Sequence, residues 1–290
     1  MAQEKPTKQT KPAKSAAAAA AAVQSQVPKP KPKKRARDNN DNDNDNNTSG
    51  KGEGASSSKR RKPSSSSAFD QEDLDLDLDA GLNTKIALLD GMLLADHLAQ
   101  KTRRFGTDLK PTELSALDIS PSAITDSSSF PGPRNLQNLP AFLEAHAKTP
   151  KALSDAPKDH GSPHTIIVAG AGLRAADLVR AVRKFQSGNI TVGKLFAKHI
   201  KIEDAKKFLA SHRTGVAVGT PVRLSDLVEC GSLKLDKLER LVVDASHIDQ
   251  KKRGIMDMKE TMIPLARWLS RAEFKERYAD SERPLQLLFY

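Results

Sequence analysis

The sequence predicts an α/β protein whose main domain is a parallel β-sheet with helices on both faces. From residue 165 onward, short apolar segments alternate with longer segments of helical periodicity, and this alternation is typical of parallel sheets. The apolar segments are continuous, as expected for strands buried on both sides. The chain carries no internal repeat, which excludes a solenoid or propeller.

The elements of this domain can be placed in order from their apolar patterns. Thr165-Ile166-Ile167-Val168 is a buried-strand signal. Thr220 with Pro221 has the composition of a helix start. We expect strands at 165–168, 189–192, 215–218 and 238–244, and helices at 173–185, 203–212, 221–228 and 256–270. Ligands of such sheets bind beyond the carboxyl ends of the strands, which here are residues 169–174, 220–223 and 244–247.

The region before this domain predicts two further parts. Residues 1–80 read as a disordered tail, because they hold too few apolar side chains to offset the entropy of ordering. Residues 81–150 read as a helical and extended arm, with one helix at 84–103, whose apolar stripe includes Leu93, and a short one at 136–146. The lobe proper is expected at 151–290.

The tail carries short basic clusters and ends in an acidic segment. Such clusters are typical of nuclear import signals or nucleic-acid contacts, and a solubilising tail is the alternative. The import candidates are Lys33, Lys34, Arg35, Arg37, Lys59, Arg60, Arg61 and Lys62. Residues 70–79 alternate acids with leucine and are expected to be an irregular segment that docks on a basic surface.

Composition limits the classes of function. The net charge is +11, with a basic tail and a basic C-terminal half around an acidic middle, and this asymmetry favours nucleic acid or an acidic partner. Cys230 is the only cysteine, so an internal disulfide is excluded and a reducing compartment is indicated. No apolar run approaches the ~20 residues of a membrane span.

Three segments resemble nucleotide-binding motifs but are incomplete. Residues 170–175 match G-x-G-x-x-A without the acidic residue that would bind a ribose. Residues 188–194 match the spacing of a phosphate-binding loop, yet Leu195 replaces the magnesium ligand and the intervening residues favour a strand. Asp244 ends an apolar strand, as a magnesium-linked Asp does, or it caps a turn. No histidine has partners at metal spacing, so no metal or cofactor is expected.

Two helix starts are candidate phosphate contacts. Thr220 and Arg223 lie in the first turn after one strand, and Arg174 lies in the first turn after another. Free backbone N–H groups at a helix start bind phosphates, although an ordinary helix start is the alternative. Basic residues nearby complete the set of candidates for contact with RNA or a particle: Arg174, Lys194, Lys198, Lys201, Thr220 and Arg223.

Several segments together resemble one family. They are residues 86–90, 94–96, 99–105, 139–143, 173–177, 194–201 and 219–224. The chain is similar in them to the CMS-type proteins, nucleolar relatives of DEAD-box helicases associated with the 90S small-subunit pre-ribosome. The resemblance implies one RecA-like lobe with a degenerate helicase motif at Asp244, Ala245, Ser246 and His247, in which Ala245 replaces the catalytic Glu. Only about twenty residues follow Ser270, too few for a second lobe.

The function implied is a non-enzymatic ribosome biogenesis factor of the nucleus and nucleolus. Its expected partners are pre-rRNA, proteins of the small-subunit pre-ribosome and snoRNP components, with no membrane and no small-molecule substrate. Two alternatives remain open. One is a nucleotide switch that binds at Asp244 without hydrolysis, and the other is a chromatin- or DNA-associated protein that uses the basic tail.

Overall fold

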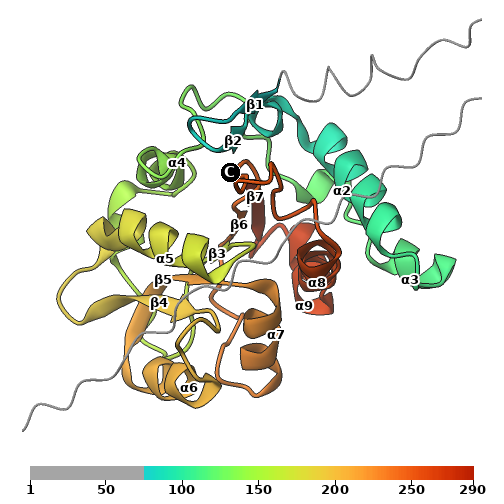
Figure 1. The fold of residues 1–290 in the computed structure, drawn as a ribbon. Coiled ribbons are helices and arrows are strands. Elements are labelled where there is room, and N and C mark those ends of the chain that lie inside the picture. The colour runs from blue at the N-terminus through green and yellow to red at the C-terminus, as the bar shows by residue number, and fades with distance from the viewer. Residues whose placement is uncertain (1–74) are drawn as a thin grey trace, which may run out of the picture. The chain divides into compact units, whose positions relative to one another are not determined.

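The computed structural model describes residues 75–290 (Figure 1). All eight import candidates and most of the expected tail lie outside the described residues. The boundaries predicted at residues 80 and 150 stay predictions.

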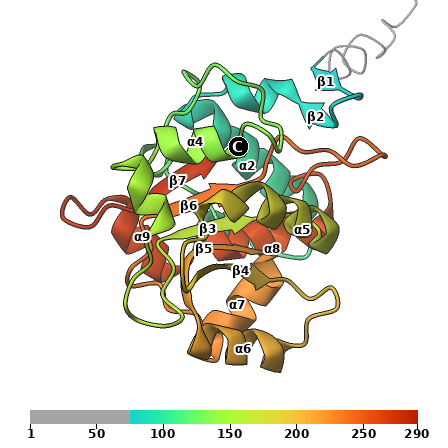
Figure 2. The same ribbon diagram turned by 90° about the vertical axis from the view of Figure 1, so that its left-hand side faces the viewer.

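The centre of the described chain is a five-stranded parallel sheet. Its strands are β3 (Thr165–Val168), β4 (Ile190–Leu195), β5 (Arg213–Gly219), β6 (Arg240–Val243) and β7 (Gln286–Phe289). They lie in the order β4-β5-β3-β6-β7, and every neighbouring pair is parallel; Figure 2 shows the strands in this order. The predicted α/β class with a parallel sheet is confirmed, and its first strand has the bounds that the sequence predicts.

Helices cover both faces of the sheet (Figure 1). One hydrophobic cluster joins α4 (Leu139–Ala145) and α5 (Gly172–Ala181) to the face that carries Ile167, Val242 and Leu288. The other cluster contains the opposite face, with Ile166, Leu241 and Leu287. The helices on that side are α2 (Gly91–Phe105), α6 (Ile202–Ser211), α7 (Pro221–Glu229), α8 (Lys259–Leu269) and α9 (Ala272–Tyr278). Burial on both faces explains why the strands read as continuous apolar runs.

The helix predicted over residues 84–103 is two helices. A 3₁₀ helix, η1 (Thr84–Leu88), ends before Asp90, whose carboxylate accepts a hydrogen bond from the Leu93 N–H at 2.9 Å and starts α2. An Asp at this position satisfies one of the free N–H groups of a new helix. The expected apolar stripe is therefore interrupted, and Leu93 is 50% exposed while Leu94 and Leu98 are buried.

Some elements carry no strong signal in the sequence. They are β1 (Leu76–Asp77), β2 (Leu82–Asn83), α3 (Pro111–Ala116), α9, β7 and two 3₁₀ turns, η2 (Pro121–Ala123) and η3 (Pro150–Ser154). The helix predicted at 173–185 is α5 followed by a 3₁₀ helix, η4 (Val182–Phe185). β1 and β2 form an antiparallel hairpin. The described part of the acidic segment, residues 75–79, thus begins a hairpin rather than an irregular stretch.

Residues 81–150 pack onto the sheet. Ile86, Leu98 and Ile124 belong to the same hydrophobic cluster as α8, and Leu139 and Phe142 belong to the cluster on the other face. Among the described residues, no helix has the length and apolar character needed to cross a bilayer.

Candidate functional site at the carboxyl ends of the strands

An internal ion pair lies at the carboxyl end of the sheet. Arg174, in the first turn of α5, donates two hydrogen bonds to Asp244, which follows β6, at 2.9 Å from Nε and 2.8 Å from Nη2. Arg174 is 8% exposed and Asp244 is 2% exposed. Two parallel N–H···O bonds make this the strong geometry for an arginine–carboxylate pair. The carboxylate at the magnesium-like position is therefore neutralised by a residue of the same chain.

The turn that matches G-x-G-x-x-A is tightly packed by its neighbours. A Cβ added at Gly170 would lie 3.2 Å from the Cβ of Ile255, and one at Gly172 would lie 2.9 Å from the Cβ of Lys198. Close approach of other segments therefore accounts for both glycines without a bound dinucleotide.

Three lysines lie in or next to the loop that follows β4 at the carboxyl edge of the sheet. The loop, residues 196–201, follows β4 and has Lys194 just before it. Lys194, Lys198 and Lys201 are all exposed, and three exposed cations close in sequence suit an anionic partner. We name residues 194–201 the lysine loop.

Residues from neighbouring elements hold the lysine loop in place. Arg223, in the first turn of α7, is 9% exposed, and its Nη1 donates a hydrogen bond to the carbonyl of Ile200 at 3.0 Å. The backbone N–H of Thr220 donates to the carbonyl of Leu195 at 3.3 Å. Thr220 is half-buried, and its side chain makes no cap hydrogen bond to α7. The start of α7 thus supports the loop that displays the lysines.

The segment with phosphate-loop spacing is a strand. Residues 190–195 form β4, which pairs with β5, so their backbone N–H groups are not curled around a common centre. The strand expected from Asn189 to Val192 is confirmed, although it runs on to Leu195.

The degenerate motif is covered by the N-terminal hairpin. The N–H of Asn83 donates to the Ser246 carbonyl at 2.7 Å, and the N–H of Ile248 donates to the Gly81 carbonyl at 2.9 Å. His247 is half-buried here, and its pKa is lowered by burial and then by the charge of Arg174. Residues 244–246 are therefore buried beside the hairpin, and His247 is half-buried.

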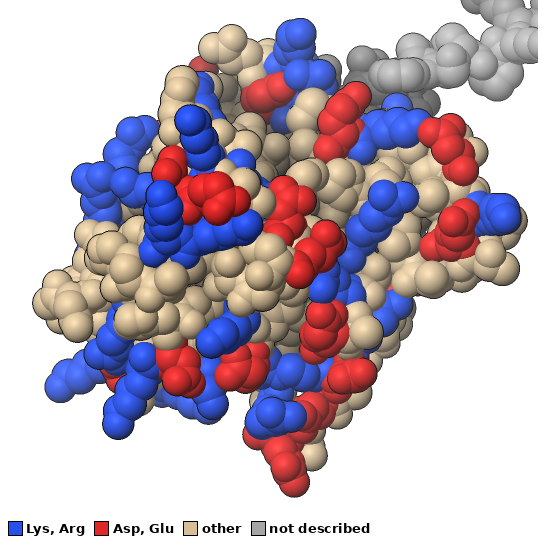
Figure 3. Space-filling model, turned by 90° about the horizontal axis from the view of Figure 1, so that it is seen from below, with Lys and Arg blue, Asp and Glu red and all other residues tan. Residues whose placement is uncertain are grey.

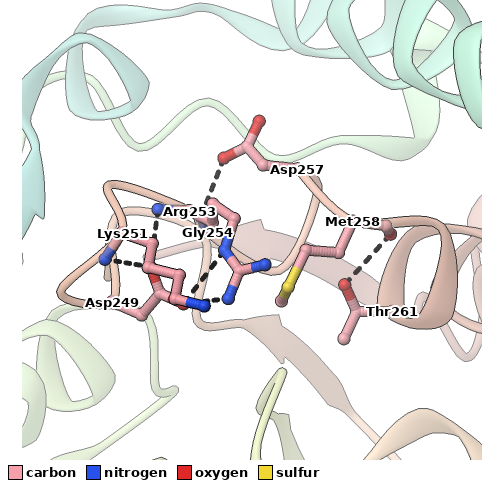
Figure 4. Close-up of polar contacts among 7 residues, drawn as sticks. All are labelled: Asp249, Lys251, Arg253, Gly254, Asp257, Met258 and Thr261. Carbon is pink, nitrogen blue, oxygen red and sulfur yellow. Dashed lines mark hydrogen bonds and ion pairs between the residues drawn. The ribbon is translucent and has the colours of Figure 1, made fainter. Parts of the chain in front are cut away.

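The loop after β6 is a rigid basic turn (Figure 4). The carboxylate of Asp249 accepts hydrogen bonds from the N–H groups of Lys251 at 2.8 Å and Arg253 at 2.9 Å, and it also pairs with the Arg253 guanidinium. Asp257 accepts from the Gly254 N–H and from Lys101 of α2. These contacts fix the loop that packs Ile255 against Gly170.

Arg134 is a residue that the sequence patterns did not single out. It lies in the loop that leads to α4, is 2% exposed, and donates from Nη2 to the Ser127 carbonyl at 2.6 Å. Its guanidinium carbon lies 4.9 Å and 4.7 Å from the ring centres of Phe130 and Phe142. Burial lowers its pKa. Ser127 and Phe130 lie in an irregular segment and Phe142 lies in α4, so no single periodic pattern marks these partners.

One face of the described residues has mixed charge. On the face drawn in Figure 3, Lys and Arg side chains alternate with Asp and Glu, and no single-sign patch covers the described residues there. No group of three His, Cys, Asp or Glu residues within 75–290 is placed to hold a metal ion.

The geometry can now be compared with known proteins. Residues 31–290 match the family model described as CMS1, U3-containing 90S pre-ribosomal complex subunit. The chain is 63% identical to Protein CMS1 of Chaetomium thermophilum over 211 residues, which cover 73% of this chain and 84% of that protein. It is 28% identical to Protein cms1 of Schizosaccharomyces pombe, over 68% of this chain and 69% of that one.

Solved structures with some similarity are DEAD-box proteins. One is a DEAD box protein of the hyperthermophile Methanococcus jannaschii, 17% identical with a TM-score of 0.33, matched over 52% of this chain and 36% of that one. Another is the yeast DEAD-box splicing factor Prp28, 19% identical with a TM-score of 0.33, matched over 52% of this chain and 32% of that one. The chain thus spans about a third of the length of these proteins, and a TM-score at this level supports no conclusion about activity.

Proposed function

The chain belongs to the CMS1 family of subunits of the U3-containing 90S pre-ribosomal complex, and from that membership we propose how it works in ribosome biogenesis. It acts as a subunit of this complex in the nucleus and nucleolus. Its partners there are pre-rRNA and assembly proteins, with snoRNP components among them.

We propose that the protein docks and does not catalyse. The support is the ion pair between Arg174 and Asp244. Both carboxylate oxygens of Asp244 accept hydrogen bonds from the guanidinium, so they are not free to bind magnesium. Ala245, next to Asp244, has no side-chain group that could orient a water. Phosphoryl transfer depends on positioned charge and metal, so these replacements favour a protein without ATP hydrolysis.

The docking surface that we propose is the lysine loop, and its partner is the phosphate backbone of pre-rRNA. Lys194, Lys198 and Lys201 are exposed on a segment whose backbone is held by the start of α7, so less backbone entropy is lost when they bind. Thr220 remains a candidate contact at the edge of this surface. We assign Arg174 and Arg223 to positioning, because each is buried and donates to a group of the chain itself.

The two alternatives have no support in residues 75–290. A nucleotide switch would need the carboxylate of Asp244, which already forms an ion pair with Arg174. The basic tail, on which chromatin binding would depend, lies outside the described residues.

The test is the association of full-length variants with the 90S particle. In the first variant, Lys194, Lys198 and Lys201 are replaced by Ala. We expect it to lose co-sedimentation with the particle on a density gradient and to crosslink less to pre-rRNA. A variant that co-sediments and crosslinks as the unchanged chain does would contradict the docking surface.

A matched control removes the same charge elsewhere. Lys151, Lys158 and Lys237 are exposed, and the last two line a hollow with His164 and Glu239 at the amino ends of the strands, the opposite edge of the sheet. Their replacement by Ala should leave association unchanged. If both triple variants lose association equally, net charge rather than the lysine loop carries the binding. Retained association with loss of RNA crosslinks would instead assign the docking to a protein.

A further inference from the structure

Most of the exposed large apolar side chains of residues 75–290 lie within residues 78–93. Leu78, Leu88, Met92 and Leu93 are 58%, 74%, 65% and 50% exposed. Within residues 75–290 only two other large apolar side chains are exposed, Leu173 and Val222, on helices of opposite faces of the sheet. Single exposed apolar residues are normal, whereas a gathering of them marks an interaction site. We name Leu88, Met92 and Leu93, with Leu78 on the neighbouring hairpin, the Met92 patch.

The backbone fixes the Met92 patch in its exposed position. The Asp90 cap sets the start of α2, and Leu94 and Leu98 of that helix face the core at 1% and 3% exposure. A Cβ added at Gly91 would lie 3.0 Å from the carbonyl oxygen of Pro121. The helix start is thus packed against η2, and rotation of α2 to bury Met92 would expose Leu94 and Leu98.

The Met92 patch lies in an acidic segment, although the protein as a whole is basic. Residues 75–96 contain five Asp and one Lys, whereas the whole chain has a net charge of +11. Asp96 is exposed and lies four residues after Met92 and three after Leu93, the spacing of neighbours on one helix face. Asp77 and Asp79, on the hairpin with Leu78, are also exposed.

We propose that the Met92 patch is the docking site for a basic amphipathic helix of a protein partner. The apolar side chains would receive its apolar stripe, and the carboxylates would pair with Lys and Arg beside that stripe. The exposed carboxylates of Asp77, Asp79 and Asp96 repel RNA and an anionic membrane. A second copy of this patch would bring like charges together. The proposal goes beyond the lysine loop, because it concerns another surface and another class of partner.

Photo-crosslinking in the full-length protein tests the proposal. Leu93 is replaced by p-benzoylphenylalanine, nuclear extract is irradiated, and the crosslinked peptide is sequenced by mass spectrometry. We expect one peptide with apolar residues at helical spacing and an excess of Lys and Arg. Crosslinks only to RNA, to a second copy of this chain or to an acidic segment overturn the proposal, and so does the absence of any crosslink.

Paired Glu variants then test binding of the identified peptide, made synthetically. Met92→Glu with Leu93→Glu should weaken binding at least tenfold, since it places charge where the apolar stripe would lie. The fold should persist, because acids in the first turn of a helix are favoured by its dipole. Leu173→Glu with Val222→Glu is the matched control, as both residues are exposed and both follow the first residue of a helix. Equal weakening by both pairs, or by neither, contradicts the proposal.

The outcome is separable from that of the proposed function. A chain with Ala at Lys194, Lys198 and Lys201 should keep the crosslink from residue 93. The Glu pair at residues 92 and 93 should keep the RNA crosslinks of the lysine loop. If only the crosslink from residue 93 is absent, the Met92 patch is contradicted. If only the RNA crosslinks are absent, the lysine loop is contradicted.

Discussion

Arg174 and Asp244 form a buried bidentate ion pair that joins the start of α5 to the end of β6. The two residues are 70 positions apart in the sequence, and their hydrogen bonds are 2.9 Å and 2.8 Å long. A buried pair of this kind holds two elements in one arrangement, whereas removal of one partner leaves an uncompensated charge.

The first prediction concerns the stability that depends on this pair. Arg174→Met should lower the free energy of unfolding by about 3–5 kcal/mol, because Asp244 would remain buried and unpaired. The double variant Arg174→Met with Asp244→Leu should be more stable than Arg174→Met alone. Urea unfolding followed by circular dichroism measures both. The exposed pair Asp177–Arg180 is the control, and its removal should change stability by less than about 1 kcal/mol.

The second prediction concerns nucleotides. Millimolar ATP with magnesium should leave the melting temperature of the full-length protein unchanged, since a ligand stabilises only when it binds the folded state and Arg174 already occupies the Asp244 carboxylate. Differential scanning fluorimetry measures this. A shift of several degrees in the unchanged protein would restore the nucleotide switch as a candidate function. A shift seen only after Arg174→Met would show that the arginine blocks such a site.

The third prediction separates contact from positioning at the lysine loop. Each phosphate that a lysine neutralises adds about 0.7 to the slope of log affinity against log salt for single-stranded RNA. Lys198→Ala should therefore reduce both the affinity and this slope. Arg223→Gln should reduce the affinity with little change of slope, because Arg223 donates to the Ile200 carbonyl rather than to RNA. Fluorescence anisotropy over a salt series gives both quantities. A slope reduced by Arg223→Gln as much as by Lys198→Ala would make Arg223 a contact residue.

The fourth prediction concerns pH. His164 is buried, with Nε2 at 3.0 Å from the Asp155 carbonyl oxygen and Nδ1 at 2.8 Å from Thr165 Oγ1. Burial, followed by the charge of Arg240, lowers the pKa of His164 to about 4. Between about pH 6.5, the pKa of histidine in an unfolded chain, and pH 4, only the unfolded state binds the proton. The free energy of unfolding should thus fall by about 3 kcal/mol as the pH is lowered through this window.

Urea unfolding at several pH values between 7 and 4 tests the fourth prediction. His247 should add to the loss of stability at low pH, because its pKa is also lowered. His164→Gln keeps a side-chain amide near the Asp155 carbonyl and removes the titrating group, so its stability should depend less on pH. The same pH dependence in His164→Gln as in the unchanged protein would contradict the role of His164.

The class of the fold and most strands of the sheet could be predicted from the amino-acid sequence. Short runs such as Ile166–Val168 are apolar because both faces of a parallel strand are buried, and this signal is local. The start of α7 at Pro221 was predictable for a similar reason, since a Pro has its own preference for the first helical turn. The resemblance to the CMS-type family was also carried by short contiguous segments.

Which residues form the site and which face solvent depends on how the elements pack in the folded chain. The pairing of Arg174 with Asp244 and the hydrogen bond from Arg223 to Ile200 join residues far apart in the chain, so no local pattern encodes them. Leu93 has the spacing of a core residue, yet the Asp90 cap restarts the helix and turns it outward. β7 is a short run whose role depends on its pairing with β6. Local sequence sets the propensity of each segment, whereas burial and partners are set by the packing of segments against one another.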